Sequence, residues 1–207
     1  MQKLKKSGAV TKTKTAFMKA CLHHAKAASL MNKGALDDAL NETRLGRKAC
    51  DTFLPLFMLE SDIRTAQGDT GRAARVLMDG FKTVPRSQVA IKWMDTYAPN
   101  FDSHFVKAAE KFVKPHKDTA IGRMVMADAC RKAGDYSRAR KLLMKVADQQ
   151  PSRDVYRRLA YLEQELEPKA PAAQKWLEKA LDAEVWIETG GYIEEFKAWQ
   201  ERGFLSS

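Results

Sequence analysis

The stretch Gly134-Asp-Tyr-Ser-Arg-Ala139 belongs to a short pattern that occurs three times in this chain of 207 residues. Gly68-Asp-Thr-Gly-Arg-Ala73 and Gly34-Ala-Leu-Asp-Asp-Ala39 have the same layout, with a glycine five residues before an alanine. Glycine adopts a positive φ at little cost at the end of a helix, and aspartate caps the start of the next helix. The pattern therefore predicts a tight turn between two helices, with the alanine at a close helix crossing.

Alanines with this role recur along the chain at a nearly constant spacing. They are 34, 35, 31 and 34 residues apart, at Ala39, Ala73, Ala108, Ala139 and Ala173. A step of 34 residues is the length of the helix–turn–helix unit of tetratricopeptide repeats. Pro85 and Pro151, each twelve residues after one of these alanines, resemble the proline of that repeat. Ala108 has no such glycine before it, so we expect an irregular third unit.

The chain is therefore predicted to be all-α, a tetratricopeptide-like superhelical array of about five helical hairpins plus a C-terminal capping helix. The array covers residues 14–184, between a flexible basic leader at residues 1–13 and a C-terminal cap at residues 185–207. Residues that favour helix, such as Ala, Leu, Lys, Arg and Glu, dominate the composition. We expect helices at residues 14–31, 36–50, 53–67, 70–83, 87–97, 102–114, 119–133, 136–149, 152–167 and 171–183, and a short last helix at residues 193–202.

The charge of the chain, formally +10, is unevenly distributed. Residues 1–48 contain eleven Lys and Arg against three acidic residues, whereas residues 161–207 contain ten acidic residues against five basic ones. A basic segment suits anionic lipid, nucleic acid or an acidic partner, but such runs are commonly just solvated, and we interpret the leader in that way. No nucleic-acid partner is expected, because the basic residues do not follow a repeating face with interleaved aromatic residues.

Compartment signals in the sequence are sparse. The three cysteines, Cys21, Cys50 and Cys130, form no C-x-x-C pair, which is typical of buried thiols in a reducing compartment. No apolar run is long enough to span a membrane, and no signal peptide is visible.

No residues are arranged for catalysis, and we expect no enzymatic activity, cofactor or metal. The sequence contains neither a glycine-rich phosphate loop nor an H-E-x-x-H motif. Cys21, His23 and His24 are the one group of soft ligands for haem iron or another metal. We interpret them as a packing thiol beside two surface imidazoles, because structural metal sites usually need four ligands.

A partner-binding groove is the site that the repeat favours. In tetratricopeptide arrays the first helix of each hairpin lines the concave face. Projection from each alanine places His24, Met31, Met58, Asp62, Thr65, Met124, Asp128, Arg131, Arg158 and Glu165 there. Methionine gives an adaptable apolar surface, and Arg131 and Arg158 are suited to clamp the carboxylate of a peptide or a propionate. The alternative is an ordinary solvated groove without a fixed ligand.

The four tryptophans divide into two groups. Trp176 precedes Leu177 on a repeat helix and is expected in the core. Trp93, Trp186 and Trp199 lie on irregular or terminal segments, which makes them the better candidates for anchoring a partner.

Two segments of the downstream half carry a more specific resemblance. They are Pro151-Ser-Arg-Asp-Val-Tyr-Arg-Arg-Leu-Ala-Tyr-Leu-Glu163 and Ala173-Gln-Lys-Trp-Leu-Glu-Lys-Ala-Leu181. They resemble the HemY family of bacterial tetratricopeptide proteins, whose pattern falls here on Pro151, Arg153, Ala160, Glu163, Trp176, Leu177, Ala180 and Trp186.

This resemblance implies a non-enzymatic protein-interaction scaffold associated with haem biosynthesis. Membrane segments upstream of this chain would hold the repeat domain at the cytoplasmic face of the bacterial inner membrane. The partners implied are proteins or peptides, haem-biosynthesis enzymes among them, and the membrane would be reached only through those segments or the basic leader. The alternative is a generic soluble adaptor that binds an acidic peptide or protein tail.

Overall fold

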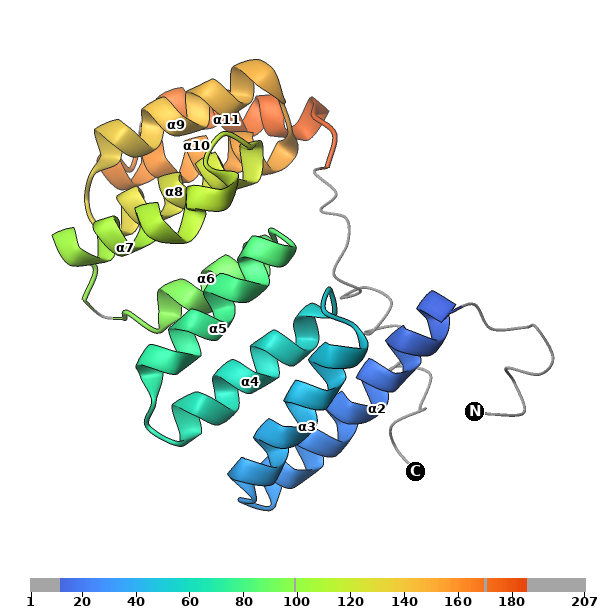
Figure 1. The fold of residues 1–207 in the computed structure, drawn as a ribbon. Coiled ribbons are helices and arrows are strands. Elements are labelled where there is room, and N and C mark those ends of the chain that lie inside the picture. The colour runs from blue at the N-terminus through green and yellow to red at the C-terminus, as the bar shows by residue number, and fades with distance from the viewer. Residues whose placement is uncertain (1–11, 99, 170, 186–207) are drawn as a thin grey trace. The chain divides into compact units, whose positions relative to one another are not determined.

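The regular structure of the chain is helical in every part that the computed structural model describes, which is residues 12–98, 100–169 and 171–185 (Figure 1). The helices are α2 (Lys12–Asn32), α3 (Leu36–Ala49), α4 (Leu54–Ala66), α5 (Thr70–Thr83), α6 (Ser87–Asp95), α7 (Ser103–Val113), the 3₁₀ turn η1 (Lys114–His116), α8 (Ala120–Lys132), α9 (Tyr136–Gln149), α10 (Arg153–Leu166) and α11 (Pro171–Asp182). Each α-helix begins and ends within two residues of its expected position. The prediction of an all-α array of tetratricopeptide-like hairpins is confirmed.

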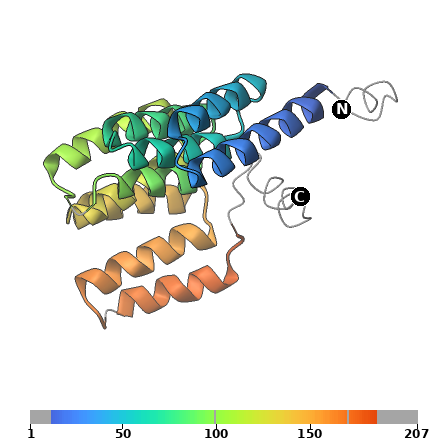
Figure 2. The same ribbon diagram turned by 90° about the horizontal axis from the view of Figure 1, so that it is seen from below.

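The described helices fall into two compact units. The amino-terminal unit contains α2–α5 and ends at Val84, and the carboxyl-terminal unit begins at Pro85 and contains α6–α11. In the first unit, α4 packs on both α2 and α3. In the second, α10 packs on α9 and α11, and Figure 2 shows α10 and α11 side by side. The last helix expected at residues 193–202, the rest of the cap expected at residues 185–207 except residue 185, and most of the basic leader lie outside the described residues.

None of the helices in the described part of the chain combines the length and the apolar character needed to cross a bilayer.

Three turns follow the glycine pattern of the sequence. Gly34, Gly68 and Gly134 adopt φ values of 76°, 78° and 78°. Asp69 caps α5 by accepting a hydrogen bond from the backbone N–H of Arg72 at 3.0 Å, and Asp135 caps α9 in the same way. These turns therefore form for the local reasons that the pattern indicates.

The recurring alanines Ala39, Ala73, Ala108, Ala139 and Ala173, which we call the alanine ladder, are buried except in the third hairpin. Ala39, Ala73, Ala139 and Ala173 are at most 4% exposed. In α7 the fully buried alanine is Ala109, whereas Ala108 is only half-buried. The register of the ladder therefore slips by one residue in this helix.

The contact between α6 and α7 is formed by aromatic side chains. The ring centroid of Trp93 lies 4.4 Å from that of Phe112 and 5.9 Å from that of Phe105, both in stacked geometry. Trp93 is 0% exposed. Its prediction as a partner anchor is therefore wrong, because α7 supplies a slot of aromatic rings that encloses the indole. Trp186 and Trp199 lie outside the described residues.

Candidate partner-binding face

The first helices of the third, fourth and fifth hairpins border two adjoining hollows in the carboxyl-terminal unit. One hollow has a volume of about 380 Å³ and is lined by Asp128, Arg131, Arg158, Tyr161, Gln164 and Glu165. The other, of about 280 Å³, shares several of these residues and adds Ile91, Met94, Lys132, Asp154 and Arg157. We call this surface the α8–α10 face.

Four of the groove residues expected from the sequence come together on this face. Arg158 of α10 donates a hydrogen bond from Nε to Asp128 of α8 at 3.1 Å, and Arg131 of α8 is paired with Glu165 of α10. The side chains of Arg131 and Arg158 are 30% and 21% exposed. Each arginine thus already holds a carboxylate of the opposing helix, and a partner's carboxylate would have to use the remaining N–H donors.

Other residues of the face did not emerge from the sequence. Ile91 and Tyr161 are 53% and 49% exposed, although apolar and aromatic side chains are usually covered. Arg157 donates a hydrogen bond from Nη2 to Tyr161 Oη at 3.3 Å, which holds the ring beside the cation. Ile91 lies on α6 and could be located only once the register of the third hairpin was known, whereas Tyr161 lies on α10 in the regular fifth hairpin.

The charge of the face is nearly balanced. Arg131, Lys132, Arg157 and Arg158 stand against Asp128, Asp154 and Glu165, which gives a formal net of +1 from four bases and three acids. The ammonium of Lys132 lies 4.7 Å from the ring centroid of Phe101. The surface therefore offers fixed cations and exposed apolar side chains side by side.

One groove residue expected in this unit lies elsewhere. Met124 is 1% exposed and belongs to the core, so its prediction as a groove residue is wrong. The reason is that α8 packs on α6, α7 and α9 at once, so most of its circumference is covered.

The expected groove residues of the amino-terminal unit lie on α2 and α4. Met31 is half-buried and packs against Ala39, Leu40 and Ile63. Met58, Asp62 and Thr65 lie along one face of α4, where Thr65 donates its hydroxyl hydrogen bond to the Ser61 carbonyl at 3.0 Å.

The soft ligands of α2 do not converge on a common point. Burial lowers the pKa of His24 to about 4, and the His24 ring meets Phe53 edge-on. Burial also raises the pKa of the Cys21 thiol to about 12, and His23 is held 2.8 Å from the carboxylate of Glu42. Both imidazoles are partly buried rather than on the surface. Among the residues that the structure describes, no group of three or more His, Cys, Asp or Glu side chains could hold a metal ion.

The residues that resemble the HemY pattern build the last hairpin. Arg153 donates a hydrogen bond from Nε to the carbonyl of Ala180 at 3.2 Å, which joins α10 to α11. Tyr156 stacks on Trp176 with 5.8 Å between ring centroids, and Glu163 is paired with Arg140 of α9 at 2.9 Å. These residues therefore stabilise the packing of α10 on α9 and α11. The Trp186 of the pattern lies outside the described residues.

Comparison with known proteins gives matches at the level of fold. No protein-family model matches the sequence, and no curated protein does, so the resemblance to the HemY family is not confirmed in this way. A solved structure of MamA, residues 41 to the end, from Desulfovibrio magneticus RS-1 is 14% identical and covers 79% of this chain and 94% of its own, with a TM-score of 0.45. YrrB, described as a TPR protein with an unusual peptide-binding site, is 12% identical and covers 75% of this chain and 81% of its own, with a TM-score of 0.41.

Proposed function

We propose that this chain is a non-enzymatic protein-interaction scaffold whose α8–α10 face binds a segment of a partner protein. The observation that carries the proposal is the pair of exposed side chains Ile91 and Tyr161 beside ion-paired arginines in a hollow. Tyrosine and arginine are enriched among the residues that dominate binding energy at protein interfaces. Because their rings and guanidinium groups are held by neighbours, little conformational entropy is lost on binding.

The partner segment has an acidic side chain next to an apolar one. A guanidinium has five N–H donors, and among the described residues the bonds of Arg131 to Glu165 and of Arg158 to Asp128 and the Asp154 carbonyl use only part of them. The donors that remain suit a carboxylate or backbone carbonyls of the partner, while Ile91 and Tyr161 offer apolar contact. This chemistry favours a function of the chain as an adaptor for an acidic peptide or protein tail.

A peptide selection tests this assignment. The immobilised chain is panned against a random peptide library, and the affinity of enriched peptides is measured by fluorescence polarisation. Tyr161→Ala is expected to weaken binding about tenfold or more, since central aromatic anchors commonly contribute over 1 kcal/mol. Leu181→Ala is the matched control, because Leu181 is 78% exposed on α11 and lies outside the face. Equal affinity of the selected peptides for both variants would exclude the α8–α10 face as their binding site.

The cellular setting that we propose is haem biosynthesis at the bacterial inner membrane. Its support is the resemblance of Pro151, Arg153, Glu163 and Trp176 to the HemY pattern. The partners would then be enzymes of haem biosynthesis, and haem itself need not be held. Purification of the natural full-length protein after cross-linking in cells is expected to recover such enzymes in the membrane fraction. If none co-purifies, this setting is wrong, whereas the peptide-binding assignment stands or falls on its own test.

A further inference from the structure

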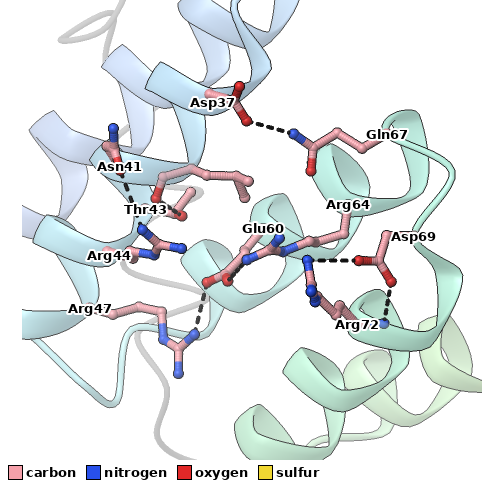
Figure 3. Close-up of polar contacts among 11 residues, drawn as sticks. Asp37, Asn41, Thr43, Arg44, Arg47, Glu60, Arg64, Gln67, Asp69 and Arg72 are labelled. Atoms are coloured by element: carbon pink, nitrogen blue, oxygen red, sulfur yellow. Dashed lines mark hydrogen bonds and ion pairs between the residues drawn. The ribbon is translucent and has the colours of Figure 1, made fainter.

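A second polar cluster lies in the amino-terminal unit, at the seam between α3 and α4. Figure 3 shows the Glu60 carboxylate between two guanidinium groups, those of Arg47 and Arg64. Nη1 of Arg47 lies 2.8 Å from Oε2 of Glu60, and Nη2 of Arg64 lies 3.7 Å from Oε1. Glu60 is 4% exposed, so this carboxylate is almost removed from water.

The cluster has more positive charge and more hydrogen-bond donors than Glu60 can satisfy. Two cations share one anion, and the 3.7 Å contact of Arg64 is too long for a hydrogen bond. The Arg64 side chain is 12% exposed, and its buried Nε–H has no hydrogen-bond partner among the residues that the structure describes. Burying a charged group with unmet donors is unfavourable, and a bound anion would offset part of that cost.

The Arg47 guanidinium is fixed in place by a second contact. It lies 4.1 Å from the ring centroid of Phe57, whose side chain is itself buried. A cation held between an aromatic ring and a carboxylate loses little freedom when it also binds a ligand.

Two further arginines flank this pair. Arg44 is exposed and donates a long 3.4 Å hydrogen bond to the neutral side chain of Asn41. Arg72 is 64% exposed and paired with Asp69 three residues before it on the chain. Asp37, the remaining acid in this view, is bonded to Gln67 at 3.0 Å (Figure 3). The four arginines and three acids leave a formal net charge of +1.

We propose that Arg47 and Arg64 form a binding site for an oxyanion, a carboxylate or a phosphate group, presented by a partner molecule. Arginine rather than lysine stands at every cationic position of the cluster, and its planar fork suits oxyanions that accept two hydrogen bonds. The site lies on α3 and α4 and shares no residue with the α8–α10 face, so it is a separate function of the molecule.

A titration of the full chain followed by NMR tests the site. The Nε–H signals of arginine are observed while inorganic phosphate is added at constant ionic strength, with chloride as the control anion. Saturable movement of the Arg64 and Arg47 signals is expected, with the exposed Arg138 signal unchanged. An acidic peptide of six glutamates, titrated in parallel, distinguishes a carboxylate ligand from a phosphate. Absence of any saturable shift with both probes, or equal movement of Arg138, would overturn the proposal.

Substitutions separate an anion site from a purely structural ion pair. Arg64→Lys keeps the charge but loses the fork, and is expected to weaken the binding of the effective anion about tenfold. Glu60→Gln removes the competing carboxylate and is expected to tighten the binding of the anion. The rise in unfolding temperature that the anion causes should then be larger than in the unsubstituted chain. If the Glu60→Gln chain is destabilised to the same extent with and without the anion, the arginines are structural only and the proposal fails.

Discussion

Gly46 of α3 lies so close to Leu56 of α4 that a Cβ atom at Gly46 would be 2.5 Å from Leu56 Cδ1. The same Cβ would lie 2.9 Å from the Cβ of His23 on α2, so three helices meet at this glycine. Leu56 is 0% exposed, so its side chain cannot move out into solvent to make room. We therefore expect Gly46→Ala to lower the free energy of unfolding by about 1–3 kcal/mol in urea denaturation.

A second glycine supplies the control for that measurement. Gly71 lies in the first turn of α5, and its added Cβ would meet nothing closer than Asp69 Oδ1 at 4.0 Å. Gly71→Ala is therefore expected to stabilise the chain by about 0.5–1 kcal/mol through the greater helix propensity of alanine. Equal effects at the two positions would contradict the close crossing at Gly46.

Trp93 is expected to behave as a core residue. Because its ring is enclosed by Phe105 and Phe112, Trp93→Ala should lower the free energy of unfolding by about 3–5 kcal/mol. Leu181→Ala, at a side chain that is 78% exposed, should change it by less than about 0.5 kcal/mol. If the Trp93→Ala chain were as stable as the Leu181→Ala chain, Trp93 would not be a core residue.

His24 is expected to make the fold sensitive to mild acid. Burial lowers the pKa of His24 from 6.5 to about 4, so between these pH values the unfolded chain binds the proton more tightly than the folded chain. The contribution of neutral His24 to the free energy of unfolding is complete above pH 6.5 and is lost as the pH falls toward 4. The whole loss is at most on the order of 3 kcal/mol. Urea denaturation at a series of pH values measures this loss.

Substitution assigns that pH dependence to one residue. His24→Gln should flatten the slope between pH 6.5 and 4.5, whereas Leu181→Ala, at an exposed position without a titrating group, should leave it unchanged. Below that window Glu42 adds its own loss, because its hydrogen bond with Lys26 lowers the pKa of the carboxyl. A slope retained in His24→Gln would show that another group is responsible.

The Arg158–Asp128 pair is expected to couple α8 to α10. Both side chains are about one-fifth exposed, so a double-mutant cycle with alanine should give a coupling energy of about 0.5–1 kcal/mol. The Arg138–Glu110 pair, with side chains 42% and 48% exposed, should give less than about 0.5 kcal/mol. Reversal of this order would indicate that the pairing at the α8–α10 face is not maintained in solution.

The features that the sequence predicted well depend on local rules. The turns at Gly34, Gly68 and Gly134 need only a positive φ, and the caps Asp69 and Asp135 act within three residues of themselves. Projection from the alanines placed Asp128, Arg131, Arg158 and Glu165 on facing helices, because the 34-residue period is the same in the fourth and fifth hairpins.

The features that it missed depend on packing between distant segments. Met124 and Trp93 were misplaced because the irregular third hairpin covers α8 and forms an aromatic slot, and neither follows from a period. The pairing of Arg158 with Asp128 joins residues 30 positions apart and depends on side-chain rotamers. Whether the expected groove residues bind a partner stays a prediction.

The slip of the ladder from Ala108 to Ala109 limits how this protein can be rebuilt from its own parts. A copy of the α4–α5 or the α8–α9 hairpin carries a buried alanine and a glycine of positive φ at its turn, which are features that these two hairpins share. In the α6–α7 hairpin, by contrast, the Trp93 ring of α6 packs on Phe105 and Phe112 of α7, so neither of these helices can be exchanged without the other. Duplication or shuffling of repeats, by evolution or by an engineer, would therefore succeed on either side of this hairpin and fail within it.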